Sequence, residues 1–426
     1  MERVSVGRFA CVRVPHFAAA AAERCEPELR ELPLAIVAGT PPATRVVEAS
    51  PAARERAVHP GLTSAEAVVR CPALLQRPVS DEAVASARHA LLDACLAVSP
   101  RVEDAGAGLV NVDLAGLRRL YGVEGDETAI GERLVRAAHG VGLEARVGIA
   151  SSRATARVAA LLGLLHGSRV SIVPPGGERA ALATIPLGAL ALGEDVAAAL
   201  ARWGITTLGG VADLPRPGLA RRLGASGLAA HDLASGVDRE PFVPWAPPPY
   251  WEEAQGLEWE IDSLGALGTV IGRALERLCA RLEAAHLWAD RLETRLALAT
   301  GGHHVRAVAL SAPMGDPRLM WTLLVLDLER HPPPSAVVGV ALSARVVPRR
   351  AQAGDLWRPA VPAVRDLAHV LTRLTALVGD ANVGAPVVAD SHHPDPVTLA
   401  PFAPAVAGAV ALSAPMGDPR LMWTLL

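Results

Sequence analysis

The feature that most limits how this chain folds is a proline-rich segment at residues 241–251. Five of its eleven residues are proline, in the order PFVPWAPPPYW. Proline lacks the backbone N–H that helices and sheet interiors need, so we expect this segment to be extended and semi-rigid. The segment predicts a linker between separately folded parts, which agrees with a length of 426 residues.

The chain before the linker changes character near residue 165. Strands are predicted at 9–14, 34–38, 45–48, 109–114 and 144–150, and helices at 64–70, 81–98 and 127–139. Residues 166–240 instead show short helices joined by glycine turns. One turn, at Gly204 and Gly209, is typical either of a phosphate-binding helix start or of an ordinary helical hairpin.

The chain after the linker begins with a second mixed pattern. A long helix is predicted at 264–286, and strands at 290–298, 304–310 and 338–347. The tail, 349–426, is rich in Pro, Ala and Val, and its residues 409–426 are identical to residues 307–324. We interpret this identity as a recent duplication or an assembly artefact, and we infer no symmetric site from it.

The overall charge and the cysteines exclude several classes of protein. The net charge is −3 and all 41 basic residues are arginine, which does not favour tight stand-alone DNA binding. The five cysteines form no CxxC pair, so neither a zinc site nor a redox pair is predicted. Without a signal-peptide pattern or an apolar run of about 18 residues, we predict a cytoplasmic protein with no cofactor.

The order of several short motifs resembles that of the Y-family (translesion) DNA polymerases, and within them the ImuB group of bacterial mutagenesis proteins. The motifs are VRVPHFA at 12–18, SPAARERAVHPGL at 50–62, SAEAVVRCPALLQR at 64–77 and GIASSRATARVA at 148–159. The resemblance covers residues 9–400 and implies an α+β fold of polymerase architecture. Its implied parts are palm and fingers at 1–165, a helical thumb at 166–240, the linker at 241–251, an α+β little finger at 252–348 and a C-terminal extension at 349–426.

The same resemblance implies that the polymerase chemistry is lost. The family holds two magnesium ions with one Asp on its first strand and an Asp-Glu pair before a second strand. These positions correspond here to Val12, Gly108 and Leu109, whose side chains offer no oxygen ligand. The alternative is an active polymerase with relocated ligands. The candidate acids for that alternative are Glu103, Asp104 and Asp113.

Remnants of a nucleotide site are implied at Phe17, Arg54, Arg153 and Arg157. Arginines at such positions either contact phosphate oxygens in a bidentate manner or form surface ion pairs, and the sequence leaves both interpretations open. The resemblance also implies contacts to the DNA backbone. The residues implied for these contacts are Gly204, Gly209, Arg291, Arg295 and Arg345.

A clamp-binding peptide is implied after the little finger. Gln352, Leu356 and Trp357 supply the amide and the two apolar side chains that such peptides use, and a simple loop tryptophan is the alternative. The implied function is a non-catalytic adaptor in damage-induced (SOS) translesion synthesis, a component of a mutasome. Its implied partners are weakly bound DNA, the sliding clamp, a RecA-like ImuA protein and an error-prone replicative-type polymerase. A third hypothesis is a DNA-binding module without clamp or polymerase partners.

Overall fold

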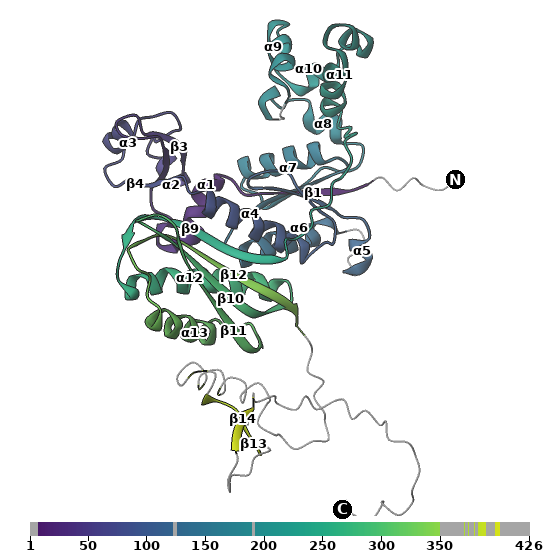
Figure 1. Ribbon diagram of the computed structural model, residues 1–426. Coiled ribbons are helices and arrows are strands. Elements are labelled where there is room, and N and C mark those ends of the chain that lie inside the picture. The colour runs from purple at the N-terminus through teal and green to yellow at the C-terminus, as the bar shows by residue number, and fades with distance from the viewer. Residues whose placement is uncertain are drawn as a thin grey trace, which may run out of the picture. The chain divides into compact units, whose positions relative to one another are not determined.

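The computed structural model describes residues 7–121, 126–189 and 192–349, and in the C-terminal region residues 370, 374, 379, 382–388 and 397–400 (Figure 1). Backbone contacts divide the chain into two units, Met1–Gln352 and Ala353–Leu426. In the second unit, β13 (Ala385–Val388) pairs antiparallel with β14 (Val397–Ala400). Everything that positions the candidate site lies in the first unit.

A five-stranded central sheet, in the order β5-β6-β1-β7-β8, forms the middle of the first unit. Its strands are β1 (Phe9–Arg13), β5 (Val102–Asp104), β6 (Leu109–Asp113), β7 (Arg146–Ala150) and β8 (Val170–Ile172). Strand β1 pairs antiparallel with both β6 and β7. Helices α4 (Asp81–Leu96) and α6 (Glu127–Gly140) cover one face and α7 (Arg153–Leu165) covers the other (Figure 1).

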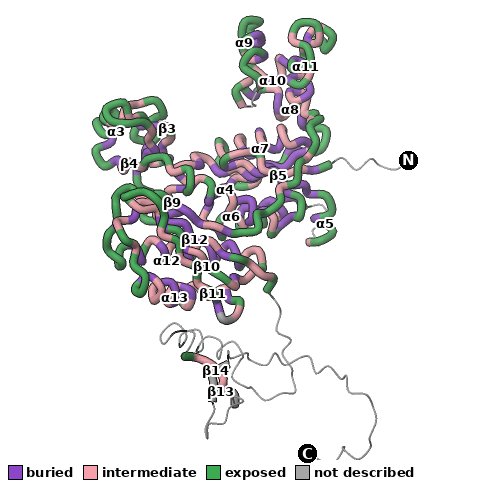
Figure 2. Tube along the Cα trace, viewed as in Figure 1, coloured by how far each residue is buried: buried purple, intermediate pink, exposed green. Residues whose placement is uncertain are grey.

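Both faces of the central sheet are buried, as Figure 2 shows along its strands. Because side chains alternate along a strand, Ala10 and Val12 face α4 and α6, whereas Cys11 faces α7. Helix α7 lies very close to β7. A Cβ atom at Gly148 would lie 2.1 Å from the carbonyl oxygen of Ala156, so this approach requires glycine.

A three-stranded sheet in the order β3-β2-β4 lies beside the central sheet. Its elements, with those that lead into it, are α1 (Phe17–Cys25), the 3-10 helix η1 (Pro27–Leu29), β2 (Leu34–Ala38), β3 (Arg45–Ala49), α2 (Pro51–Arg54), α3 (Ser64–Arg70) and β4 (Leu75–Pro78). Helix α3 begins with a capping box in which Thr63 and Glu66 each accept the other's backbone N–H, which fixes where the helix starts.

A helical part follows the central sheet and has its own core. Its elements are α8 (Glu178–Leu182), η2 (Leu187–Ala189), α9 (Glu194–Arg202), α10 (Leu208–Ala212) and α11 (Arg216–Ala234). Val158 of α7 also belongs to this core, so the helical part is joined to the central sheet through α7. The short helix α5 (Leu117–Leu120) is not part of this helical region and follows directly after β6 in the chain.

A four-stranded second sheet, in the order β11-β10-β12-β9, follows the linker. Its elements are β9 (Tyr250–Ile261), α12 (Leu264–Ala284), β10 (Leu287–Leu298), β11 (His303–Met314), α13 (Pro317–Arg330) and β12 (Val337–Pro348). Helix α12 packs on this sheet because its buried residues recur every three or four positions, as at Leu267, Ile271 and Leu278.

The element predictions agree well with the observed secondary structure. The helices predicted at 81–98 and 264–286 correspond to α4 and α12, and the strand predicted at 109–114 corresponds to β6. Among the described residues, no helix combines the length and the apolar character needed to cross a membrane.

Candidate functional site

The strand register decides which side chains of β1 and β6 face the same side of the central sheet. Arg13 stands opposite Leu109, whereas Val12 stands opposite Val110. Val12 therefore faces α4 and α6, where it is completely buried in the core. A metal ion held jointly from β1 and from the position of Leu109 needs a β1 side chain on the same face. On β1 that side chain is Arg13. Val12, one residue earlier, points to the opposite face of the sheet because side chains alternate along a strand.

The turn before β6 has a backbone shape that suits only glycine. Gly108 has a φ of +71°, and its carbonyl accepts a hydrogen bond from the N–H of Val14 at 2.8 Å. A Cβ atom at Gly108 would lie 2.8 Å from the Val14 carbonyl oxygen and 2.9 Å from the ring of Phe17. An aspartate would not fit here without a backbone shift. Phe17 is buried against this turn and is not open to a bound nucleotide.

The three acids considered as relocated ligands are each held in an ion pair by an arginine. The pairs are Glu103–Arg153 (2.7 Å), Asp104–Arg88 (2.8 Å) and Asp113–Arg101 (2.9 Å). Glu103 also accepts a hydrogen bond from the side-chain amide of Asn111 at 2.8 Å. Within the described part of the chain, no group of three or more His, Cys, Asp or Glu side chains is placed to hold a metal ion.

Arg153, at the start of α7, ties the linker region to the central sheet. Its guanidinium donates to Glu103 at 2.7 Å, to Asp238 at 2.6 and 2.8 Å, and to the carbonyl oxygens of Glu240 and Pro241. The hydrogen bonds to Asp238, together with those to Glu103, outweigh burial and raise the pKa of Arg153 above its ordinary value. These contacts occupy the N–H groups that a phosphate would need, so Arg153 acts as a structural ion-pair residue in this arrangement.

The linker itself crosses one end of the central sheet, from the middle strand β1 to the edge strand β5. The ring of Phe242 stacks on Phe9 with 6.1 Å between the ring centroids. The N–H of Trp245 donates to the carbonyl of Val102, on the edge strand β5, at 2.7 Å. The indole of Trp245 stacks on His89 of α4. The linker therefore packs against this end of the sheet as well as joining two parts of the fold.

Three arginines gather where β1 ends and β7 begins. Arg13 stands directly opposite Arg146 on the neighbouring strand, and Arg157 extends from α7. Burial lowers the pKa of Arg13, and the nearby guanidinium of Arg157 lowers it further. Arg54, on α2, is exposed. The pKa of His16, just before α1, is lowered first by burial and then by the nearby Arg54. The sequence motifs predicted Arg54 and Arg157 as site residues. The strand register shows that Arg13 and Arg146 also lie in this region.

The glycine turn of the helical part has its N–H groups already bonded. Gly204 has a φ of +75° at the end of α9. Leu208 and Gly209 donate their N–H groups to carbonyls that follow α8, at 2.8 and 3.1 Å, and Gly210 donates to the Thr207 hydroxyl at 3.3 Å. This pattern is that of a helical hairpin and leaves no free donor for a phosphate at these three residues.

The arginines implied as DNA contacts on the second sheet are mostly paired. Arg291 and Arg345 stand opposite each other on β10 and β12. Arg345 donates to both carboxylate oxygens of Asp290 at 2.8 and 2.9 Å, and Arg295 donates to Glu252 at 2.9 Å. Arg291 is exposed and forms no ion pair with the described residues. A phosphate at this surface would therefore compete with Asp290 and Glu252 for two of the three arginines.

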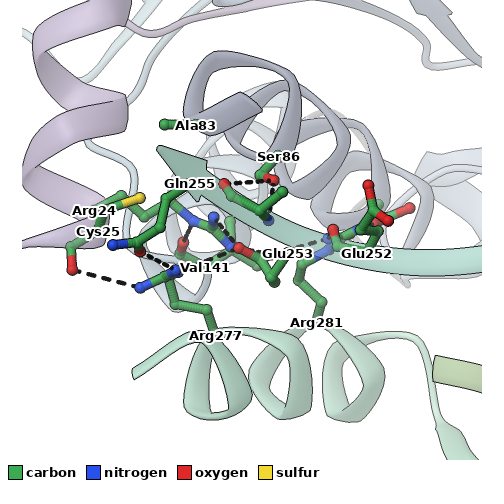
Figure 3. Close-up of polar contacts among 12 residues, drawn as sticks. Arg24, Cys25, Ala83, Ser86, Val141, Glu252, Glu253, Gln255, Arg277 and Arg281 are labelled. Atoms are coloured by element: carbon green, nitrogen blue, oxygen red, sulfur yellow. Dashed lines mark hydrogen bonds and ion pairs between the residues drawn. The ribbon is translucent and has the colours of Figure 1, made fainter. Parts of the chain in front are cut away.

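The second sheet is fastened to α1 and α4 by a buried ion cluster centred on Glu253 (Figure 3). Glu253, on the edge strand β9, accepts from Arg24 of α1 at 2.7 Å through each carboxylate oxygen. It also accepts from Arg277 and Arg281 of α12, at 3.2 and 2.9 Å. Arg281 in turn pairs with Asp93 of α4 at 2.6 Å. None of these five side chains is more than 9% exposed.

The two carboxyl groups of this buried ion cluster respond differently to their surroundings. Burial by itself raises the pKa of Glu253, but Arg24 and Arg281 outweigh burial and hold that pKa at about 2. For Asp93, burial outweighs Arg281 and the pKa is raised. Glu253, with three guanidinium partners, is therefore the carboxylate on which the cluster depends.

Sequence reasoning missed this cluster because its members are far apart along the chain. Arg24 and Glu253 are separated by 229 positions. A weak signal existed on α12, where Arg281 shares the buried face with Leu278 and Leu282. The clamp-binding prediction at Gln352, Leu356 and Trp357 and the second copy of the repeat lie outside the described residues.

Comparison with known proteins places the chain among relatives of DNA polymerases. Residues 12–161 match the model of the impB/mucB/samB family. Protein ImuB of Caulobacter vibrioides (strain NA1000 / CB15N) is 30% identical over 340 residues, which cover 79% of this chain and 73% of that protein. DNA polymerase IV of Halorhodospira halophila is 27% identical over 345 residues, covering 79% of this chain and 94% of the relative.

Solved structures are matched at lower identity. DinB from Sulfolobus solfataricus is 14% identical, with a TM-score of 0.46, over 80% of this chain and 99% of that one. The Dbh DNA polymerase, in an insertion ternary complex, is also 14% identical, with a TM-score of 0.47.

Proposed function

Because the chain belongs to the ImuB group of the impB/mucB/samB family, and so shares the Y-family polymerase fold, we propose that it is a non-catalytic adaptor in damage-induced mutagenesis. In this role it holds primer–template DNA loosely and brings an error-prone polymerase to it. The alternative function, an active translesion polymerase, requires a pair of metal-binding carboxylates.

The observation that carries this proposal is the composition of the sheet face where β1 and β6 meet. Two-metal phosphoryl transfer needs carboxylates that hold two cations about 4 Å apart. This face presents Arg13 and Leu109, and Gly108 lies in a turn without space for a side chain. The nearest acids on the same face, Glu103 and Asp113, are each engaged by an arginine.

The proposed partners follow from the family and from the surface chemistry. The peptide from Gln352 to Trp357 would dock on a sliding clamp through its amide and its two apolar side chains. A RecA-like ImuA protein and an error-prone replicative-type polymerase complete the proposed cytoplasmic assembly. Contacts to DNA would be few and sensitive to salt, since Arg295 and Arg345 are already paired with acids.

Primer extension decides between the adaptor and the active polymerase. The purified chain is incubated with a primer–template duplex, all four deoxynucleotides, and either Mg²⁺ or Mn²⁺. We expect no incorporation above that of a heat-inactivated sample. Incorporation that disappears in Glu103→Ala or Asp113→Ala would refute the adaptor proposal and establish relocated ligands.

Capture by the clamp separates the adaptor from a DNA-binding module without partners. We expect immobilised sliding clamp to retain the full chain and to lose it when Leu356 and Trp357 are both replaced by alanine. The matched control replaces Trp259, an exposed tryptophan on β9, by alanine and should leave capture unchanged. Failure of the unmutated chain to bind the clamp would favour the third hypothesis.

A further inference from the structure

A small cavity opens where three parts of the first unit meet. It measures about 190 Å³ and is lined by α1, by the chain from β4 into the start of α4, and by residues 255–258 of β9. Figure 3 shows one lining residue from each of these parts, namely Cys25, Ala83 and Gln255. Drug-sized ligands occupy pockets of about 300–1,000 Å³, so the occupant of this cavity is a smaller molecule or a single side chain.

One wall of the cavity is apolar. Burial raises the pKa of the Cys25 thiol, so this side chain is neutral and belongs to that wall. The exposed fraction of Val79 is 40%, which places the cavity at the surface of the protein. An occupant therefore turns a hydrocarbon part toward this wall. The other residues of the wall come from α1, β2 and α4, and they are Ala18, Ala22, Ile36 and Ala83.

The charged groups around the cavity are mainly acidic. Glu26 follows α1, Glu82 lies in the first turn of α4, and Glu258 lies on β9. Arg77 on β4 pairs with Glu26 at 2.8 Å and with Glu258 at 3.1 Å. Glu82 accepts a hydrogen bond from the Ser80 hydroxyl at 3.0 Å and forms no ion pair with any described residue. Three carboxylates and one guanidinium give the lining a net charge of −2.

Neither a neighbouring arginine nor a metal ion accounts for this charge. Arg277 of α12 lies behind the wall, where it donates to the carbonyl of Cys25 at 3.4 Å. Its other partners are Glu253 at 3.2 Å and Gln255 at 2.7 Å, so it belongs to the buried ion cluster. Within the described part of the chain, no group of three or more His, Cys, Asp or Glu side chains is placed to hold a metal ion. The charge and the apolar wall together favour an organic cation.

We propose that this cavity binds a primary alkylammonium group. The ammonium offers three donors, and the carboxylate of Glu82 is the acceptor that no cation of the described chain engages. The alkyl chain covers the apolar wall, as the stem of a lysine does on apolar surfaces. Because the lining comes from α1, α4 and β9, the bound cation also adds to the contact between the second sheet and these helices. The proposal does not depend on the adaptor role.

Isothermal titration calorimetry of the full chain with putrescine, a short diamine, tests the charge requirement. We expect saturable binding at low ionic strength, weakened about fivefold in Glu82→Gln, as for an ion pair at an exposed carboxylate. The matched control is Glu194→Gln, which removes an exposed carboxylate from the first turn of α9. An absence of saturable binding, or equal weakening by the two substitutions, overturns the proposal.

Filling the cavity tests its shape separately from its charge. Ala22→Leu places a larger side chain in the cavity and leaves every carboxylate in place, so we expect putrescine binding to be lost. The matched control is Ala198→Leu, at an exposed position of α9, which should bind as the unmutated chain does. Diamine that only gathers around surface acids would bind Ala22→Leu as well as the unmutated chain, and that result refutes a cavity site.

Thermal unfolding separates loss of the ligand from loss of the fold. A ligand that binds only the folded chain raises the Tm, so putrescine should stabilise the unmutated chain and Ala198→Leu but not Ala22→Leu. Glu82 is exposed, so Glu82→Gln keeps the fold and decides the question even if Ala22→Leu unfolds. An equal gain in Tm for the unmutated chain and for Glu82→Gln contradicts the proposed site.

The alkylammonium comes either from a free diamine or from a lysine side chain of another protein, since this chain has no lysine. The same titration with N-acetyl-lysine amide distinguishes these sources. Tighter binding of putrescine identifies a free diamine, and tighter binding of the lysine derivative identifies a protein side chain. Binding of neither compound overturns the proposal. These measurements involve no nucleotide incorporation and no clamp capture, so their result is distinct from the tests of the proposed function.

Discussion

Replacing Glu253 with glutamine removes the central charge of the buried ion cluster and keeps the shape of the side chain. In the unmutated chain Glu253 faces Arg24, Arg277 and Arg281, and Asp93 is the only other carboxylate of the cluster. Three guanidinium groups and two carboxylates carry a net charge of +1, which becomes +2 in the variant. Glutamine also turns an N–H₂ group toward an arginine, so at least one donor meets another donor.

Two estimates of the destabilisation agree. Removing one partner of a buried ion pair costs about 3–5 kcal/mol, because the other charge is left buried without compensation. Separately, a carboxyl group whose pKa falls from 4.5 to about 2 on folding contributes about 3 kcal/mol at neutral pH. We therefore expect Glu253→Gln to lose about 3–5 kcal/mol in the contact between the second sheet and helices α1 and α4.

Hydrogen exchange in β9 measures this contact locally. A loss of about 3 kcal/mol corresponds to exchange roughly 150-fold faster for the protected amides of Tyr250–Ile261. The matched control is Glu252→Gln, one residue earlier on the same strand. Glu252 pairs with Arg295 at 2.9 Å, and both side chains are more than 40% exposed, so this control should change stability by less than about 1 kcal/mol.

The refuting result is equality between the two variants. If Glu253→Gln exchanges no faster in β9 than Glu252→Gln does, the buried ion cluster does not hold the second sheet in place. A loss of protection spread evenly over the central sheet would also contradict the reasoning, because Glu253 would then support the whole unit rather than one contact.

The first unit leads to three more expectations, two at other contacts and one on the pH dependence of Glu253. Gly148→Ala places a Cβ atom 2.1 Å from the backbone of α7 and should cost at least about 2 kcal/mol in chemical denaturation, whereas Gly265→Ala, with open space around it, should cost nothing. Arg153→Met frees the linker, so chymotrypsin should cut within residues 241–249 faster than in the unmutated chain; equal rates would count against the ion pairs as the anchor. The stability difference between the unmutated chain and Glu253→Gln should shrink as the pH falls from about 4.5 toward 2, since the lowered pKa of Glu253 gives stability only above that range; a difference constant with pH would contradict this.

The sequence predicted those parts of the fold whose signals are local. Hydrophobic periodicity located α4, α12 and β6, and the order of motifs identified the family. Periodicity succeeds there because each element buries one face of its own residues. Which side chains of β1 point to which face of the sheet was not predictable in this way. Ala10, Cys11 and Val12 are all buried, so the strand shows no alternation between apolar and polar residues.

The candidate site was only partly predictable for a related physical reason. Arg157 lies in a recognisable motif, but Arg13 and Arg146 are brought opposite each other by strand register, which no spacing along the chain reveals. Arg153 lies in the same motif as Arg157, yet it is bonded to Asp238 near the linker, 85 positions away. Residue type and motif therefore suggested phosphate contacts equally for both, and only tertiary contacts distinguished them.

The hydrogen bond from Trp245 to the edge strand β5 limits how far the second sheet can travel. Only four residues, Ala246 to Pro249, separate this attachment from Tyr250, where β9 begins. At about 3.1 Å per residue in a proline-rich chain, the tether reaches roughly 15 Å. A larger displacement of the second sheet must detach Trp245 from β5 and Phe242 from Phe9, in addition to breaking the buried ion cluster that joins the second sheet to α1 and α4. The linker therefore limits the motion of the second sheet in two ways: through its short length and through the contacts of Trp245 and Phe242 with the central sheet.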